Sequence, residues 1–400
     1  MSRNLYILGS DSNARFLASQ FACRNDSWLR LSLMFNKDSV LRSYFNSESM
    51  ITYENRLNRY NPVRVTSKVP AVLEPQVERN DGVRMFTDKT TEGTASRPSE
   101  DRHIDNLIVT NRASQRWVRL QRYRDYMTSD TNLVFVNPVL GSMERAMKGL
   151  YGENKKQCPQ LWQVLSSHVL ENGQNFDVKH LTAGDVRISA CPRTESFLEL
   201  VERQEQLFPN DREVPYCIKK MMELPMLNSL YFPYRDAYVT QLERMVVDCC
   251  IYPLVALLDG DLPTISSVRT IEQTVSHIIE ECLLVLGHLN RVKALRKIDP
   301  TIDAVLDKQR LFDIVLQIIN TVDTSSRRSK KDKFHEGNAI LQAKLLPSVG
   351  MTSKLDLRGA NGYIVLMGKE QKVDTPVNRT LMDLVTTRQM MRQDERDVPE

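Results

Sequence analysis

The first part of the chain alternates short apolar runs with amphipathic segments. Runs suited to buried strands lie at Leu5 to Leu8, Leu29 to Phe35, Asn106 to Thr110 and Leu133 to Val136. A turn follows the first run, and the next segment has the spacing of a helix from Ala14 to Ala22. This strand, loop, helix and strand order is typical of a dinucleotide-binding βαβ unit in a parallel sheet.

Further elements of the first part are less regular. We expect helices at Ser114 to Met127, Leu161 to Leu170, Ser196 to Leu207 and Cys217 to Met222, and sheet at Val178 to Cys191. The stretch from 66 to 102 is rich in Thr, Ser, Glu and Pro, which predicts a polar insertion with one short strand at Val83 to Phe86.

From Arg235 onward the apolar spacing is helical almost throughout. The predicted helices are Arg235 to Leu258, Ser267 to Leu289, Lys308 to Thr321, Gly337 to Leu346, Gly359 to Lys369 and Asn378 to Met391, with Asn378 as the expected cap of the last. The predicted architecture is therefore an α/β Rossmann-like domain at 1–232 followed by an all-α domain at 233–400.

Composition narrows the class without naming an activity. The 400 residues are 41% hydrophobic and 26% charged with a net charge of +4, so we expect globular domains and only local basic surfaces. Seven cysteines without a CxxC pair fit reduced core thiols. The sequence shows no apolar run of the ~20 residues that a membrane span needs, and no secretory signal.

Metal and nucleophile chemistry finds little support in the sequence. The six histidines are scattered and form no HExxH pattern, so no metal site is predicted. A GxSxG element and a P-loop are also missing from the sequence.

The turn after the first strand resembles a phosphate-binding loop but departs from it. In the frame of GxGxxG the chain has Gly9, Asp11 and Ala14. Ala14 is compatible with a cofactor, whereas Asp11 places a carboxylate where a pyrophosphate must approach. Like charges ~4 Å apart cost roughly 1–4 kcal/mol in partly screened surroundings. The structural alternative is that Asp11 caps the following helix.

The segment LERMVVDCCIYPLVALL, from Leu242 to Leu258, predicts one buried helix and resembles the signature helix of the ketopantoate reductases. In that family a catalytic lysine begins the run, asparagines follow, and Asn-Pro-Leu closes it. Here Arg244 stands at the lysine position, Asp248 and Tyr252 stand at the asparagine positions, and Pro253 is retained. Arginine is a poor proton donor, and Arg244 can instead pair with Asp248 one turn away.

The resemblance extends over most of the chain. Arg112 in DNLIVTNRASQ takes another lysine position, Asn137 in LVFVNPVLGSMERA matches an asparagine turn, and VKHLTAGDVRI carries His180 and Gly184. ANGYIVLMGKEQKVDTPVN resembles the closing helix of the family. Without gaps, the catalytic glutamate of the family falls at Asp356.

One branch of the family is more similar still. DNLIV, TNLVFVNP and NGYIVLMGK resemble fungal mitochondrial proteins that activate translation of, or stabilise, cytochrome b messenger RNA. That branch keeps the reductase fold without evident reductase activity. The resemblance implies a factor of the mitochondrial matrix, or one associated with the inner membrane, that acts on the 5′ leader of this messenger. It also implies a second protein subunit such as a related paralogue, and contact with the mitochondrial ribosome.

Two basic segments are candidates for RNA contact. The first, within Asn111 to Tyr126, is an expected helix with Trp117, Leu120 and Tyr123 toward the sheet and Tyr126 offering a stacking surface; its basic residues are Arg112, Arg116, Arg119, Arg122 and Arg124. The second is a polar loop with Arg327, Arg328, Lys330 and Lys331. The alternative in both cases is a solvated charged surface.

These observations leave three functions open. The favoured one is a non-enzymatic mitochondrial gene-expression factor that binds cytochrome b messenger and needs no cofactor. The alternative is an NADPH-dependent 2-dehydropantoate 2-reductase with a divergent site. A third is a ribosome-associated structural subunit without selectivity for one RNA.

Overall fold

The computed structural model describes residues 3–24, 28–58, 61–74, 76–77, 83–84, 103–111, 117–152, 154–192, 214–258, 265, 268–325, 357 and 359–397. The described residues up to Ala237 form one compact unit, and those from Tyr238 onward form a second. The expected helices at 196–207 and 337–346 lie outside the described residues.

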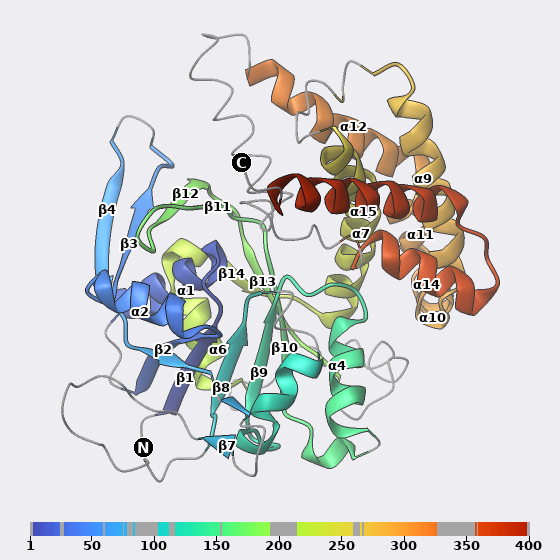
Figure 1. Ribbon diagram of the computed structural model, residues 1–400. Helices are drawn as coiled ribbons and strands as arrows, with labels where there is room; N and C mark the ends of the chain where they lie inside the picture. The colour runs from blue at the N-terminus through green and yellow to red at the C-terminus, as the bar shows by residue number, and fades with distance from the viewer. Residues whose placement is uncertain are drawn as a thin grey trace. The chain divides into compact units, whose positions relative to one another are not determined.

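The first unit is built on an eight-stranded sheet (Figure 1). In spatial order its strands are β14 (Ser229–Tyr231), β13 (Val186–Ala190), β10 (Gln160–Ser166), β9 (Asn132–Val136), β8 (Asn106–Val109), β1 (Arg3–Leu8), β2 (Leu29–Phe35) and β5 (Ala71–Leu73). The pairs from β5 to β10 are parallel, and β13 runs antiparallel to β10. The chain leaves β1 for β2 on one side and later returns to β8 on the other, so a topological switch point lies between β1 and β8.

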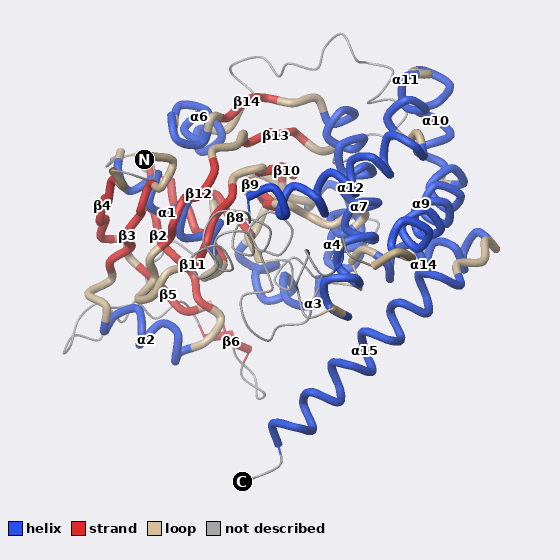
Figure 2. The backbone as a smooth tube through the Cα atoms, turned by 90° about the horizontal axis from the view of Figure 1, so that it is seen from above, coloured by secondary structure: helices blue, strands red, loops and turns tan. Residues whose placement is uncertain are grey.

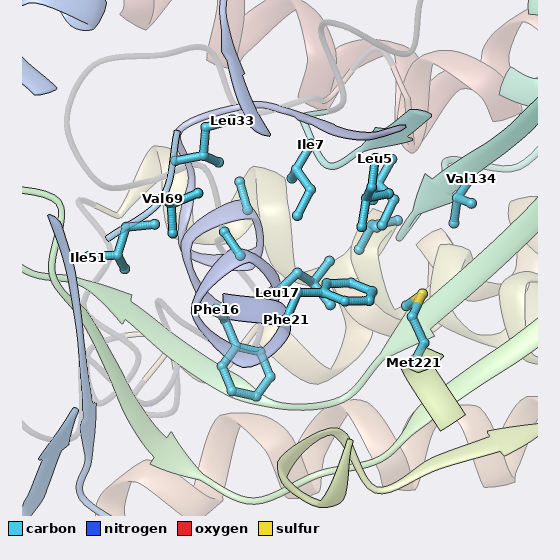
Figure 3. Packing of buried hydrophobic residues seen from close by; sticks show 14 of the residues in the cluster. Leu5, Ile7, Phe16, Leu17, Phe21, Leu33, Ile51, Val69, Val134 and Met221 are labelled. Atoms are coloured by element: carbon cyan, nitrogen blue, oxygen red, sulfur yellow. The ribbon is translucent and has the colours of Figure 1, made fainter. Parts of the chain in front are cut away.

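A second, four-stranded sheet has the order β11 (Val169–Asn172), β12 (Val178–Thr182), β3 (Met50–Asn55) and β4 (Val63–Lys68). Helix α1 (Ser12–Cys23) packs against strands of both sheets. Its buried residues include Leu17 and Phe21, which lie toward Leu5 of β1 in Figure 3, and Phe16, whose ring points the other way and lies 5.7 Å from that of Tyr53 in β3. The apolar residues of this helix thus pack against both sheets.

The remaining elements of the first unit are short. They are α2 (Asp38–Asn46), α3 (Trp117–Leu120), α4 (Ser142–Tyr151), α6 (Tyr216–Glu223), the 3₁₀ helices η1 (Gln121–Tyr126), η2 (Lys155–Gln157) and η4 (Pro225–Leu227), and the strand pair β6 (Gln76–Val77) and β7 (Val83–Arg84). Helices α3, η1 and α4 cover the hydrophobic cluster that contains Leu107 and Phe135.

The second unit is helical, and its elements appear in yellow to red in Figure 1. They are α7 (Tyr234–Leu257), whose first residues belong to the first unit, α9 (Ile271–His288), α10 (Asn290–Ile298), α11 (Thr301–Val305), α12 (Lys308–Ser325), α14 (Asn361–Gln371) and α15 (Pro376–Asp397). The α/β domain followed by a helical domain is confirmed, as is the burial of Leu242, Met245, Val246, Cys249 and Cys250 along α7.

The helix expected at Leu161 to Leu170 is wrong. This stretch forms β10 and β11, which belong to different sheets. The five residues from Leu161 to Leu165 are all buried, because β10 lies inside a sheet covered on both faces. A continuous apolar run of this kind does not distinguish a buried strand from a buried helix.

The continuous helix expected at Ser114 to Met127 is also wrong over its described part. Only Trp117–Leu120 is α-helical, and Gln121–Tyr126 continues as a 3₁₀ helix. Leu120 and Tyr123 are buried as expected, but Tyr126 is buried too and Trp117 is 43% exposed. Trp117 is therefore the exposed aromatic residue and Tyr126 the buried one, the reverse of the expectation.

The cap expected at Asn378 is wrong as well, because α15 begins at Pro376. The amides of Val377 and Asn378 donate to the Glu281 carboxylate of α9, over 2.7 and 3.0 Å. A carboxylate from another helix thus satisfies N–H groups of the first turn that have no partner inside α15.

Candidate functional site

The residues of the loop after β1 lie at the switch point, where dinucleotides bind in open α/β sheets. Gly9 has φ +144°, and an added Cβ would lie 2.3 Å from the Thr110 hydroxyl oxygen. Thr110 directly follows β8. Only glycine fits at position 9, because the ends of β1 and β8 approach each other so closely here.

Asp11 bridges this crevice and caps α1. Its Oδ1 accepts the Ala14 amide hydrogen at 3.0 Å, and its Oδ2 lies 2.8 Å from the Thr110 hydroxyl oxygen. Burial raises the pKa of the Asp11 carboxyl, while the Ala14 amide, the Thr110 hydroxyl and the Arg15 guanidinium act in the opposite direction. The expected capping role of Asp11 is confirmed.

Arg15 fixes the same loop from the other side. Its Nε donates to the Ser10 carbonyl at 2.9 Å, and its Nη1 donates to the carbonyls of Gly173 and Asp177 at 3.2 and 3.0 Å. The guanidinium also lies 5.0 Å from the ring centre of Phe176. Arg15 therefore ties the loop to the turn between β11 and β12.

A dinucleotide cofactor does not fit this loop as it stands. The N-terminus of α1 would bind a pyrophosphate through backbone N–H groups. The Asp11 carboxyl fills that position and already accepts one of those groups. The conflict is steric whatever the charge of Asp11, and an ionised carboxylate adds repulsion. The Gly9, Asp11 and Ala14 positions thus form a self-capped helix start.

Asn137 serves the main chain at the end of β9. It has φ +47°, and its backbone N–H donates to the Val164 carbonyl at 2.7 Å. Its side-chain Oδ1 accepts a hydrogen bond from the Ser166 backbone N–H at 2.9 Å. Asparagine tolerates the left-handed conformation better than most residues. The contacts with β10 give Asn137 a structural role.

The positions equivalent to catalytic residues on α7 lie in a different unit from the loop after β1. Asp248 and Tyr252 are buried, at 8% and 1% exposure, whereas Arg244 is partly exposed. The pairing of Arg244 with Asp248 stays a prediction. Asp356 lies outside the described residues.

Pro253 has a specific hydrogen-bonding consequence within α7. Proline has no N–H, so in an α-helix the carbonyl four residues earlier loses its donor. That carbonyl belongs to Cys249, and it accepts a hydrogen bond from Asn361 Nδ2 of α14 at 2.9 Å. The side chain of Asn361 therefore replaces the hydrogen bond that the proline removes.

Asn361 in turn belongs to a chain of polar groups that joins four helices. Its Nδ2 also donates to Asn378 Oδ1 at 2.9 Å, and Asn378 Nδ2 donates to Glu281 at 2.8 Å. Asn361 and Asn378 are both fully buried. The contacts connect α7, α14, α15 and α9, so these family-like residues have a role in the fold that does not depend on catalysis.

The arginines proposed for RNA contact separate in the structure. Arg122 donates to the buried carboxylate of Glu74, which also accepts the Tyr123 hydroxyl at 2.8 Å. Arg119 and Arg124 are exposed. The other candidates, Arg112, Arg116, Arg327, Arg328, Lys330 and Lys331, lie outside the described residues.

Sequence reasoning missed a buried histidine pair in the first unit. His180 Nε2 lies 3.0 Å from His168 Nδ1, His180 Nδ1 lies 2.9 Å from the Tyr53 hydroxyl, and His168 Nε2 lies 2.9 Å from the Leu227 carbonyl. His168 Nδ1 also accepts the Gly184 amide hydrogen at 3.0 Å. The two histidines are twelve residues apart, on and beside different strands, so their spacing carried no signal.

The donors and acceptors of this pair fix its protonation. Because Gly184 N–H always donates, His168 Nδ1 must be unprotonated, and its Nε2–H donates to Leu227. His180 then donates through Nε2 and accepts from Tyr53 through Nδ1. Burial lowers the pKa of both histidines, that of His180 to about 4, with His168 adding to the effect. The pair is neutral at pH 7.

Metal and membrane sites find no support in the part of the chain that the structure describes. Among those residues, no group of three His, Cys, Asp or Glu side chains is placed to hold a metal ion. No helix there is both long enough and apolar enough to cross a membrane.

The fold defines the class of protein, a Rossmann-like sheet followed by helices as in ketopantoate reductases and related dehydrogenases. D-mandelate dehydrogenase with NADH and anilino(oxo)acetate superposes with a TM-score of 0.59 at 16% identity, covering 97% of this chain and 98% of that one. Residues 236–389 match the family described as ketopantoate reductase PanE/ApbA C terminal. This match covers the C-terminal part of the chain, which is therefore similar to the ketopantoate reductase-like family.

Two curated relatives span nearly the whole chain. A "Probable 2-dehydropantoate 2-reductase" of Schizosaccharomyces pombe is 24% identical over 97% of both chains. The cytochrome B translational activator CBS2 of Saccharomyces cerevisiae is 22% identical, over 90% of this chain and 88% of its own length. The similarity to both an enzyme and a translational activator agrees with the resemblance found in the sequence.

Proposed function

We propose that this chain is a non-enzymatic member of the ketopantoate reductase-like family that supports expression of cytochrome b messenger RNA in the mitochondrion, through the 5′ leader. The observation that carries the proposal is the self-capped start of α1. The Asp11 carboxyl occupies the crevice between β1 and β8 and uses a backbone N–H group that a pyrophosphate would need. The protein thus keeps a cofactor-binding fold whose cofactor position is filled.

The catalytic positions support the same conclusion. Arg244 stands where the family has a lysine that transfers a proton or polarises a keto group, and arginine stays protonated. Tyr252 stands at an asparagine position and is buried. By contrast, Pro253, Asn361 and Asn378, which hold the helices together, are retained. A chain that uses the fold but does not perform the reaction would show this division.

The similarity to a translational activator over 90% of the chain supports the proposed biological role. The proposed partners are the messenger and a second protein subunit, with the mitochondrial ribosome nearby. The rival function is NADPH-dependent reduction of 2-dehydropantoate, and it is favoured by the name of the relative from Schizosaccharomyces pombe.

NADPH titration separates the two functions. The purified chain is expected to show no saturable NADPH binding by fluorescence at high micromolar concentration. The Asp11→Gly variant, which opens the loop, is expected to bind about 5- to 1,000-fold better, the range that relief of 1–4 kcal/mol of repulsion gives. Tight binding by the unaltered chain, with turnover of 2-dehydropantoate, would establish the reductase.

Recovery of bound RNA from cells tests the proposed role directly. The full chain is tagged in its own cells and crosslinked, and the attached RNA is sequenced beside an untagged control. Selective enrichment of cytochrome b transcript over other mitochondrial messengers is expected. Cosedimentation with ribosomes without enrichment of one messenger would favour the structural-subunit reading, and recovery of no RNA above the control would refute the proposal.

A further inference from the structure

Helices α3 and α4 lie side by side (Figure 2), and α3 carries an exposed indole. Trp117 is 43% exposed, and its side chain packs across Gly149 of α4. A Cβ added at Gly149 would lie 2.6 Å from Trp117 Cγ, so any other residue there would displace the ring. The indole is thus supported from beneath while much of its surface remains open to solvent.

Exposed cationic side chains lie on α3, η1 and α4, the elements around this indole. Arg119 follows Trp117 by two residues, Lys148 precedes Gly149, and both are exposed. Arg124 is exposed on η1, with its guanidinium 5.9 Å from the ring centre of Tyr151 at the end of α4. Among the residues that the structure describes, none of these three cations forms an ion pair with a carboxylate. Arg122, by contrast, is neutralised by Glu74.

Exposed cations without a carboxylate partner, on the same elements as an open aromatic ring, suit single-stranded nucleic acid. The cations contact phosphates, and the ring stacks on a base that is not enclosed in a duplex. A protein partner would require acidic side chains facing the cations and a pocket shaped for the indole, whereas unpaired RNA supplies phosphates and stacking bases along its whole length.

We propose that Trp117, Arg119, Arg124 and Lys148 form a surface that binds unpaired RNA by stacking and phosphate contact. The biological role of this surface rests on the proposed function. The sequence indicated part of it, because Arg119 and Arg124 were candidates. The contribution of α4 and the role of Trp117 as the stacking residue come from the tertiary structure.

Anisotropy of a fluorescein-labelled oligouridylate, titrated with the full purified chain, measures binding to this surface. Trp117→Ala is expected to weaken binding by about 5- to 150-fold, the range of one stacked base, and Trp117→Tyr is expected to restore most of it. Arg119→Gln with Lys148→Gln is expected to reduce the slope of log affinity against log salt by about 1.4, since each phosphate contact contributes about 0.7.

A matched control uses cations far from the surface in sequence. Lys293 and Lys297 of α10 are exposed at a spacing of one turn, and Lys293→Gln with Lys297→Gln makes the same change in charge. This control is expected to leave the affinity and the salt slope unchanged. Thermal unfolding verifies that each variant is folded, and Trp117→Leu, which is apolar but cannot stack on a base, replaces the alanine variant if that variant unfolds.

The proposal is overturned if the unaltered chain does not bind the oligouridylate, or if the folded Trp117→Ala or Trp117→Leu variant binds it as tightly as the unaltered chain. It is also overturned if the control pair weakens binding as much as the Arg119 and Lys148 pair, or if duplex RNA binds as tightly as oligouridylate. Binding of an acidic mitochondrial ribosomal protein in place of RNA would assign the surface to a protein. If cells still yield cytochrome b transcript with Trp117→Ala, the surface fails while the proposed function stands. If the oligouridylate binds as expected but cells yield no transcript, the RNA-binding surface stands and the proposed function fails.

Discussion

Replacing Asn361 with alanine is expected to lower the free energy of unfolding by about 3 kcal/mol, because it removes the donor for two buried acceptors, each costing about 1–3 kcal/mol when left unsatisfied. The acceptors are the Cys249 carbonyl and Asn378 Oδ1. Urea unfolding followed by far-UV circular dichroism measures the change, since the second unit is helical. An effect below about 0.5 kcal/mol, typical of a surface substitution, would contradict the described role.

The link to Pro253 makes this prediction specific. In Pro253→Ala the main chain regains an N–H that can donate to the Cys249 carbonyl within α7. Asn361→Ala should therefore cost about 1–2 kcal/mol less in the Pro253→Ala background than alone. Leu254→Ala, a buried neighbour outside the hydrogen-bond chain, is the control background. Equal costs of Asn361→Ala in all backgrounds would show that the proline and the asparagine act independently.

Acidification from pH 7 to pH 4 is expected to destabilise the first unit by about 3 kcal/mol through His180, since its pKa falls from 6.5 in the unfolded chain to about 4 in the fold. Between these values the unfolded chain binds more protons than the folded one. The contribution is therefore complete above pH 6.5 and is lost as the pH falls toward 4. Protonating His168 at Nδ1 would also replace the acceptor of the Gly184 backbone N–H by a second donor, so the two N–H groups would face each other.

His180→Gln is the matched variant for this measurement. Its carbonyl oxygen can accept from Tyr53 and its NH₂ can donate to His168, so the contacts persist without a titrating group at 180. Tryptophan fluorescence follows the first unit, because Trp28, Trp117 and Trp162 all lie in it. The variant should lose most of the slope of stability against pH between 4 and 6.5. An unchanged slope would show that other groups cause the acid sensitivity.

The features that the sequence predicted correctly depend on neighbouring residues, whereas those that it missed depend on contacts between residues far apart in the chain. The strands at 29–35 and 133–136 and the helix α7 were predicted, because their apolar periodicity reflects local geometry and burial. The helix predicted at 161–170 was wrong, because a strand buried on both faces of a sheet does not alternate between apolar and polar residues. The cap of α15 was missed, because its carboxylate comes from Glu281, almost a hundred residues earlier.

The candidate site shows the same division. The residue types at Asp11 and Arg244 led to the prediction of an altered reductase site, since a carboxylate repels phosphate and arginine is a poorer proton donor than lysine. Thr110, which bonds to Asp11, had no local signal, because it follows a strand that becomes a neighbour only when the sheet forms.

By itself, the sequence indicated an α/β part followed by helices, the resemblance to ketopantoate reductases, and the residue types that stand at the cofactor and catalytic positions of that family. The tertiary structure decided which polar groups satisfy one another: Asp11 with Thr110, His180 with His168, and Asn361 with the carbonyl that Pro253 leaves without a donor. The physical reason is that apolar patterning acts through the period of each element, whereas a buried hydrogen bond requires two particular atoms that the folded chain brings within 3 Å.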